Sequence, residues 1–531
     1  MPAPTALTGF AHQWNFNAAT LEFATGGSEV SGVTIARGDT INAYVPIAET
    51  VPTPAYRNGL VFEAAKYAVI HGTGTNRGMA AYGWTGTAEY PTAGTVSRSM
   101  CIISHYTGDT PTTFDPQNCA FIIVFKYSIR GNTSDEDVVL LDLNAKLVIK
   151  IDKTTHAIKV DSSGGGGGTS LRYAHNGTNI LYVSSSATEV KVRTITQPTV
   201  NTLPDEILGT TASAILIFGS KLTTGANRFC GKWQRVYAYT SASNSDADVL
   251  SAMQTVATEF GVQTKRHMVV FLGTSHMNGF FDVPGMSVPE RVAEAHPDWL
   301  VMSFAKESAN FDPEILAQID SLVACVAGMA PVGGKVVVYI EGGTNENLGG
   351  GTTTGTANTN LGTCLTGIET GLDSEAITNY KIVAGTCRPL AQIGASDVTV
   401  AATEVWNRAF AGLVRARLGV TIDAVVDRQA TYDTGAGTAA ACRTLVTADP
   451  SGINRSFLPA APTGTFGDGT YVVDLVAATA ALGADGIHDG ILGQEQYASA
   501  VSTKIGALLG GGGRPPQLQA VAAMRAMGAI P

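Results

Sequence analysis

The sequence predicts two folded regions: an all-β region of antiparallel strands, followed by an α/β region built on a mainly parallel sheet. At 531 residues the chain is too long for one ordinary domain. Up to residue 262, short runs of β-forming residues follow one another, separated by Gly, Asn, Asp and Ser. After residue 262, apolar runs alternate with segments that have the apolar spacing of amphipathic helices.

The first region, 1–262, contains many short strand candidates at close spacing, which is typical of an antiparallel sandwich or barrel. The clearest runs are CAFIIVFKYSI (119–129), VVLLDLN (138–144), KLVIKID (146–152), AIKVD (157–161), NILYVSS (179–185), TEVKVRTI (188–195), AILIFGS (214–220) and KWQRVYAYT (232–240). The tract SSGGGGGTS at 162–170 predicts a flexible loop between strands. A helix is expected over 244–262, where Ser and Asp precede apolar residues at helical spacing.

The second region, 263–510, predicts a mainly parallel sheet with helices on both faces, because its strand candidates are almost wholly apolar. The strands are expected at 268–272, 299–303, 335–340, 380–385 and 420–426, with a further candidate at 470–475. The helices are expected at 313–328, 360–372, 401–418 and 490–509. Ligands of such sheets bind at the carboxyl ends of the strands. The remaining segment, 511–531, predicts a Gly/Pro hinge and a short helix.

Composition and charge exclude several classes of function. The net charge of −10 argues against nucleic acid as a partner, because nucleic-acid-binding proteins usually carry a basic face. The 7 Cys form no CxxC pair and the 9 His lack metal-ligand spacing, so we expect free thiols, no metal and no cofactor. The first residues, MPAPTALTGFAHQWNFN, do not resemble a signal peptide. No run of about 18 apolar residues occurs, so membrane insertion is not expected.

Ser275 is the candidate nucleophile. It lies in FLGTSHMNGF (271–280), where an apolar strand stops abruptly at a glycine. A nucleophilic serine needs a base, and three histidines lie in this region: His276, His296 and His488. His488 is the best candidate, because Asp485 precedes it by three residues and could orient its ring. The alternative is that Asp485 and His488 are only a solvated pair in a loop.

Asn345 is the candidate donor to an oxyanion. It follows another buried strand in YIEGGTNENLGG (339–350), where its side-chain NH₂ could face a substrate at the edge of the sheet. The alternative is a turn asparagine that begins a Gly-rich loop.

Taken together, these pieces resemble the Ser-Gly-Asn-His (SGNH, or GDSL-like) hydrolase family over roughly 266–508. VVFLGTSH resembles its first block, YIEGGTNE its Gly-x-Asn-Asp/Glu block, and DGIHDGILGQEQYA its final Asp-x-x-His block. The resemblance implies a three-layer, flavodoxin-like α/β fold and a serine esterase. It implies Ser275 as nucleophile, His488 as base and Asp485 as its orienter, with Asn345 and the N–H of Ser275 in the oxyanion hole.

Two positions depart from the family pattern. Thr274 stands where the family usually has an aspartate before the nucleophile. The second block, WLVMSFAKESAN, has no glycine to contribute its N–H to the oxyanion hole, and Ala305 falls nearest that place. A backbone donor does not require glycine, so Ala305 could supply this N–H.

The first region is similar to concanavalin-like (LamG-type) jelly rolls, chiefly over ILIFGSKLTTGANRFCGKWQRVYAYTSASNSDADVLSAMQTVATEFG (215–261). Such domains often bind carbohydrate. Aromatic residues that could stack on sugar rings are Trp84, Tyr90, Tyr106 and Tyr173, although core packing would use them equally well.

A jelly roll beside an SGNH domain implies an esterase that removes O-acetyl or similar short acyl groups from a polysaccharide. The pairing is reminiscent of phage tail proteins, which implies a virion-tail or extracellular location, with a homotrimer or other tail proteins as partners. A cytoplasmic location is the alternative. A second hypothesis is a glycan-binding structural tail protein with an inert SGNH domain. A third is a lipase-like enzyme, which the polar stretch GGGTTTGTANTN (349–360), interpreted as a loop, does not favour.

Overall fold

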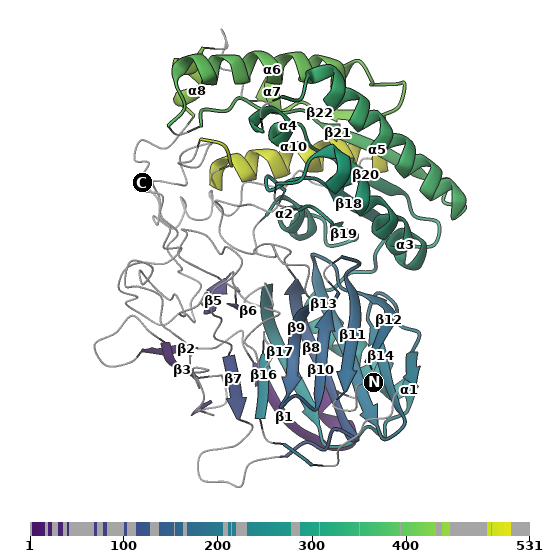
Figure 1. Cartoon of the computed structure of the whole chain (residues 1–531). Helices are drawn as coiled ribbons and strands as arrows, with labels where there is room; N and C mark the ends of the chain where they lie inside the picture. Colours follow the sequence, from purple (N-terminus) through teal and green to yellow (C-terminus); the bar gives the residue numbers. More distant parts are fainter. Residues whose placement is uncertain are drawn as a thin grey trace. The chain divides into compact units, whose positions relative to one another are not determined.

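The computed structural model divides into two compact units, one ending at Thr264 and the other beginning at Lys265 in the described part of the chain (Figure 1). The described residues are 3–15, 20–23, 30–34, 40–41, 68–71, 78–81, 100–103, 113–127, 137–152, 154–162, 167–204, 211–213, 215–218, 231–277, 287–306, 308–349, 351–392, 394–431, 438–445, 486–489 and 491–510. The strand expected at 470–475 and the segment 511–531 lie outside these residues.

The first unit is built mainly from antiparallel β-strands. Its strands are β1 (Phe10–Asn15), β2 (Thr20–Phe23), β3 (Val30–Thr34), β4 (Thr40–Ile41), β5 (Ala68–His71), β6 (Gly78–Ala81), β7 (Met100–Ile103), β8 (Asn118–Tyr127), β9 (Val138–Leu143), β10 (Leu147–Ile151), β11 (Ala157–Ser162), β12 (Gly167–Tyr173), β13 (Thr178–Ser186), β14 (Glu189–Thr194), β15 (Asn201–Pro204), β16 (Ile215–Phe218) and β17 (Gly231–Tyr239). A short 3-10 helix, η1 (Pro4–Ala6), precedes β1, and helix α1 (Asp246–Glu259) follows β17.

The described strands of this unit form two large sheets and one small sheet. One large sheet has the order β15-β14-β13-β8-β17-β6-β5, with β1 also paired to β17. The other has the order β12-β11-β10-β9-β16-β7, and β2, β3 and β4 form the small sheet. All eight predicted runs coincide with strands, and the pairs are antiparallel as predicted. The jelly-roll connection order stays a prediction.

The glycine tract at 162–170 is only partly a loop, so the predicted loop is too long. Strand β11 continues to Ser162, and β12 already begins at Gly167. A side chain at Gly168 would place its Cβ 2.8 Å from the side chain of Leu203. The glycine there lets β12 approach Leu203 closely, which the composition of the tract does not reveal.

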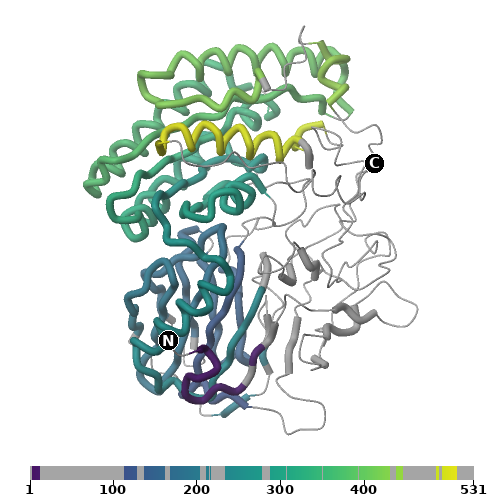
Figure 2. The backbone as a smooth tube through the Cα atoms, turned by 180° about the vertical axis from the view of Figure 1, so that it is seen from behind, coloured from purple at the N-terminus to yellow at the C-terminus, as the bar shows by residue number. Residues whose placement is uncertain are grey.

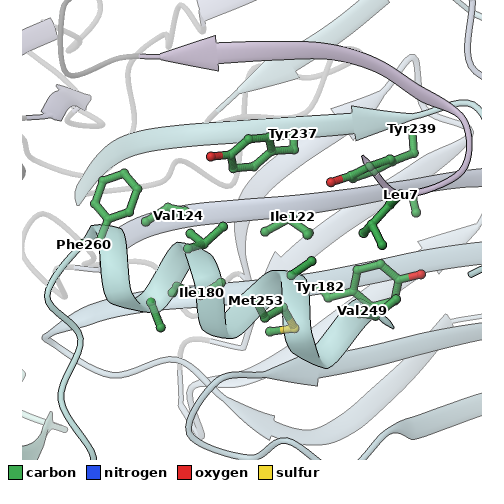
Figure 3. Packing of buried hydrophobic residues seen from close by; sticks show 14 residues of the cluster. Leu7, Ile122, Val124, Ile180, Tyr182, Tyr237, Tyr239, Val249, Met253 and Phe260 are labelled. Carbon is green, nitrogen blue, oxygen red and sulfur yellow. The ribbon is translucent and has the colours of Figure 1, made fainter. Parts of the chain in front are cut away.

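Helix α1 forms an apolar core with the sheet that contains β8 and β13 (Figure 3). Ser245 caps the helix by accepting a hydrogen bond from the N–H of Asp248, at 3.1 Å. Val249, Met253 and Val256 are buried at helical spacing on one face. They pack in one cluster with Ile122, Val124, Ile180, Tyr182, Tyr237, Tyr239 and Phe260.

The substitution Met253→Ala is expected to destabilise the first unit by about 2–5 kcal/mol, because it leaves a cavity under α1. Gln254→Ala, at the exposed neighbouring position of the same helix, is the matched control and should change stability by less than about 0.5 kcal/mol. Urea unfolding of the whole chain, followed by circular dichroism, measures both. Equal midpoints for the two variants would contradict the core position of Met253.

The second unit contains a parallel sheet, as predicted. Its strands are β18 (His267–Leu272), β19 (Trp299–Ser303), β20 (Val336–Ile340), β21 (Tyr380–Gly385) and β22 (Ala424–Val426), in the order β19-β18-β20-β21-β22. Every neighbouring pair is parallel. The chain runs from β18 to one side and then returns to the other, so the strand order reverses at β18. In sheets of this kind, ligands bind at the carboxyl ends of the strands beside such a reversal.

Helices cover this sheet in two groups. They are α2 (Val288–Ala295), α3 (Ile319–Met329), α4 (Thr344–Leu348), α5 (Thr354–Ser374), α6 (Asp397–Arg415), α7 (Arg428–Thr431), α8 (Ala439–Arg443) and α10 (Ile491–Leu509), with the short turns η5 (Phe311–Ile315) and η6 (Leu316–Gln318) before α3. Helix α10, yellow in Figure 2, contacts α2 and β22, whereas α5 contacts α3 and α6. Strands β18, β19 and β20 are almost wholly buried, which requires cover on both faces.

Several predicted boundaries in this unit are wrong. The stretch interpreted as the polar loop 349–360 is helical from Thr354, where the Thr353 hydroxyl accepts a hydrogen bond from the N–H of Thr356 at 3.1 Å. The expected helix over 313–328 becomes regular only at Ile319, and the strand expected at 420–426 begins at Ala424. Helices α2 and α4 lie outside the predicted ranges. They are only 8 and 5 residues long, which is too short for a clear periodic pattern of apolar residues.

Candidate active site

Ser275 lies in a tight turn at the carboxyl end of β18. The turn is closed by a hydrogen bond from the N–H of Met277 to the carbonyl of Thr274, at 3.0 Å. The N–H of Lys306, beyond β19, donates to the carbonyl of Gly273 at 3.0 Å. Ser275 is 6% exposed. The strand end is therefore pinned to its neighbour, and the serine side chain is held in an almost closed environment.

The structure brings His488 to Ser275. Its Nε2 lies 2.8 Å from Oγ of Ser275, although the two residues are 213 positions apart in the sequence. His488 lies in the segment Gly486–Asp489, just before α10, and is half-buried. This distance is within the range in which a base takes a proton from a hydroxyl. Asp485, the predicted orienter of His488, lies outside the described residues.

Asn345 lies in the first turn of α4, beyond the carboxyl end of β20. Leu272 of β18 is opposite Ile340 of β20, so both chain segments leave the same edge of the sheet. The Asn345 side chain is half-buried, and its Nδ2 donates to the carbonyl of Ala309 at 2.8 Å. This bond uses one N–H of the amide and fixes its orientation.

Steric contacts explain why glycine occupies positions 342 and 343, shortly before Asn345. Gly343 has a φ of +97°, and a Cβ there would lie 2.7 Å from the ring of Phe410. A Cβ at Gly342 would lie 2.7 Å from the ring of Phe311. The turn that presents Asn345 is thus packed against two aromatic rings and excludes larger residues.

Ala305 follows β19 by two residues and is 7% exposed. Its N–H points to the hydroxyl of Ser303, with a long distance of 3.4 Å. The neighbouring N–H of Phe304 donates to the carbonyl of Phe271 at 2.8 Å and so belongs to the sheet. Ala305 therefore lies at the same sheet edge as Ser275, and its role as an oxyanion donor stays a prediction.

A buried charged cluster, defined here as Glu341, Arg388, Arg428 and Asp489, adjoins Ser275 and was not predicted from the sequence. Arg428 Nη2 lies 3.0 and 2.8 Å from the two carboxylate oxygens of Asp489. Arg388 Nε lies 3.0 Å from Asp489 Oδ1, and Arg428 Nη1 lies 3.5 Å from Glu341 Oε1. All four side chains are almost fully buried. Glu341 directly follows β20, and Arg388 and Arg428 follow β21 and β22 by three and two residues, but no motif in the sequence marks these residues.

Two residues that flank Ser275 bind to this cluster. Thr274, where the resembling family has aspartate, donates its hydroxyl to Glu341 Oε2 at 3.1 Å. His276 Nδ1 lies 3.4 Å from Asp489 Oδ2. The Glu341 carboxylate, directly after β20, thus contacts the turn that carries Ser275.

Burial and ion pairing set the charges in the cluster. Burial alone would raise the pKa of Asp489, but the charges of Arg388 and Arg428 outweigh it and hold this pKa well below its usual range. Burial raises the pKa of Glu341 against the opposing effects of Arg428 and the Thr274 hydroxyl. Burial lowers the pKa of His276 to about 3, so its imidazole is neutral near pH 7.

Neither a metal centre nor a membrane span is found in the described part of the chain. No group of three or more His, Cys, Asp or Glu there could hold a metal ion. No described helix is both long and apolar enough to cross a membrane. The described free cysteines are all buried, as expected of small apolar side chains: Cys119, Cys325, Cys364, Cys387 and Cys442.

Comparisons with known proteins give weak likenesses. No family model matches the chain, and no curated protein sequence matches it. Similar solved structures include an inhibitor-bound aryl esterase of M. smegmatis, with 15% identity over 46% of this chain and 100% of that chain, and a TM-score of 0.31. They also include a family two carbohydrate esterase of Clostridium thermocellum in complex with cellohexaose, with 9% identity over 75% and 91% of the two chains, and a TM-score of 0.29. At these TM-scores, a function has to be inferred from the side chains of the site.

The neutral His276 predicts a stability that depends on pH. Between about pH 6.5, where an unfolded histidine titrates, and pH 3, the folded chain binds fewer protons at this residue than the unfolded chain. The contribution of neutral His276 to the free energy of unfolding is therefore fully present above pH 6.5 and is lost as the pH falls from 6.5 to 3. Relative to His276→Asn, the free energy of unfolding of the wild type should decrease by up to about 1.4 kcal/mol for each pH unit of acidification. Denaturant unfolding from pH 7 to pH 4.5 measures this, and parallel curves for the two proteins would contradict it.

Proposed function

We propose that the second unit is a serine ester hydrolase with Ser275 as nucleophile and His488 as base. The observation that carries this proposal is the 2.8 Å contact between His488 Nε2 and Ser275 Oγ at the carboxyl edge of the sheet. A hydroxyl that is bonded to an imidazole can lose its proton as it attacks, which is the requirement of nucleophilic serine catalysis.

The reaction would take place in two halves. Ser275 Oγ attacks the ester carbonyl carbon, its proton passes to His488 Nε2, and the carbonyl π electrons move to the oxygen. The tetrahedral intermediate collapses, and the leaving alkoxide takes the proton from His488. A water molecule then loses a proton to His488 and attacks the acyl group, and Ser275 leaves with that proton. Asp485 would stabilise the imidazolium in both halves.

The negative oxygen of each intermediate needs donors that are already oriented. Asn345 suits this role, because its hydrogen bond to Ala309 fixes the amide and leaves its second N–H for the substrate. The backbone N–H of Ser275 would be a second donor, and that of Ala305 a third. A carbonyl oxygen placed among these groups would lie at the strand ends beside Ser275.

For the substrate, we propose an O-acetyl or similar short acyl ester on a polysaccharide. The β-strand unit before the esterase would bind the glycan if it has the jelly-roll fold that its sequence resembles. The same resemblance supports a virion-tail or extracellular protein, as a homotrimer or with other tail proteins. A glycan-binding tail protein with an inert second unit is the alternative, and the Ser275–His488 contact favours the enzyme.

Ser275→Ala is expected to abolish hydrolysis of p-nitrophenyl acetate, because no other residue would form the acyl-enzyme. Release of p-nitrophenol from the acetate and octanoate esters, compared for wild type and variant, measures this. Preference for the octanoate would favour the lipase-like alternative. No difference between wild type and variant, on these esters and on acetylated polysaccharide, would favour the inert tail protein.

Asn345→Ala is expected to lower kcat for p-nitrophenyl acetate by roughly 10²–10³-fold, with a much smaller change in KM, because an oxyanion donor acts mainly in the transition state. Asn347→Ala is the control: this residue lies on the same short helix and bonds to Thr403 and Asn407 of α6. If both variants lose activity equally, Asn345 supports the turn and does not contact the oxyanion.

A further inference from the structure

A single buried guanidinium group, that of Arg388, holds both chain neighbours of His488. Its Nη2 donates to the carbonyl of Ile487. Its Nε lies 3.0 Å from Oδ1 of Asp489. Arg388 is 1% exposed and Asp489 is fully buried. The residue before the proposed base therefore accepts a hydrogen bond from this group, and the residue after it is ion-paired with the same group.

Arg388 is itself anchored on the rigid part of the unit. It follows β21 by three residues, and the buried side chain of Asn407, on α6, donates to its carbonyl at 2.8 Å. Three residues further on, the N–H of Ala391 donates to the carbonyl of Gly486 at 2.8 Å. The segment that begins at Arg388 thus runs beside the segment that carries His488 and is bonded to it at two places.

The carboxylate of Asp489 also contacts the turn that carries Ser275. Asp489 Oδ2 lies 3.4 Å from Nδ1 of His276, the residue after Ser275. Gln494 Nε2 donates to the carbonyl of His276 at 2.9 Å and lies 3.4 Å from Asp489 Oδ2. The positions of the serine turn and of the histidine segment are therefore set against one another by contacts with the Asp489 carboxylate.

A purely stabilising role explains this arrangement poorly. Buried ion pairs have a large desolvation penalty, and well-packed apolar residues often stabilise a fold equally well. Two guanidinium groups already balance the negative charge of Asp489. The electrostatic effect of this carboxylate on the imidazole of His488 is therefore small. The contacts of Arg388 instead fix the geometry of the segment that carries His488. Geometry matters here because displacing a catalytic group by about 1 Å can lower the rate of a reaction about 10²-fold.

We infer that Arg388 is a positioning residue for catalysis: it holds the segment Gly486–Asp489 so that His488 stays within hydrogen-bond distance of Ser275. This inference rests on the proposed function of Ser275 and His488. It requires the planar fork of a guanidinium, because one group must meet a carbonyl and a carboxylate in different directions.

The test compares Arg388→Lys with Arg428→Lys. Both variants keep the buried positive charge and replace an arginine that is ion-paired with Asp489, so both should lower the melting temperature. For p-nitrophenyl acetate, kcat should fall at least about tenfold further in Arg388→Lys, with KM within about twofold of the wild type. Equal losses of kcat would overturn the inference and leave Arg388 a structural residue.

Crystal structures of the wild type and both variants provide a readout that does not depend on activity. In Arg388→Lys, the separation of His488 Nε2 and Ser275 Oγ should exceed hydrogen-bond range, whereas Arg428→Lys should keep it. An unchanged separation in Arg388→Lys overturns the inference whatever the rates. If the wild type shows no Ser275-dependent hydrolysis but His488 is displaced in Arg388→Lys, the proposed function fails, and only the conclusion that Arg388 holds His488 beside Ser275 stands.

A second variant tests the same segment without altering a charge, in case Arg388→Lys does not fold. Gly486 has a φ of +69°, and a Cβ there would clash with the carbonyl oxygen of Ala391. Gly486→Ala should therefore displace the His488 segment and lower kcat at least about tenfold with KM nearly unchanged. Wild-type kcat in this variant would overturn the inference.

Discussion

The carboxylate of Asp489, buried between two guanidinium groups, is the interaction on which the rest of the site depends. It joins elements that follow different strands of the sheet and the segment that leads into the last described helix. The residues that meet around it, directly or through one partner, are His276 after β18, Glu341 after β20, Arg388 after β21 and Arg428 after β22. Because each partner lies shortly after a strand, the chain segments that leave four parallel strands meet around one carboxylate.

The architecture of the second unit could be predicted because its strands are buried on both faces. Such strands are nearly continuous apolar runs, and MVVFL and WLVMS are recognisable without any long-range information. The prediction failed where composition and conformation disagree. Helix α5 begins among threonines and asparagines that are weak helix formers, and β12 begins within a glycine tract. In both places, a cap or a close packing partner decides the structure, and neither is visible in a local pattern.

Part of the candidate site could be proposed from the sequence, and the reason is similar. Ser275, His488 and Asn345 belong to short motifs, so each could be found from its neighbours in the sequence. The charged cluster has no such motif: Arg428 and Asp489 are 61 residues apart, and neither residue is unusual in its own segment. Only the fold brings them together. The role of Asp485 stays a prediction, because this residue lies outside those described. Sugar binding by the first unit also stays a prediction, because it concerns a ligand.

The separation of 213 residues between Ser275 and His488, the proposed nucleophile and base, also has a consequence for biosynthesis. Chains fold from the amino terminus as they are made, and the serine turn at the end of β18 emerges long before the segment that precedes α10. A nascent chain would carry a fully formed hydroxyl with nothing to deprotonate it. If Ser275 and His488 act as proposed, hydrolytic activity would appear only after the segment before α10 has reached the serine turn, so the onset of activity would report that this part of the fold is complete.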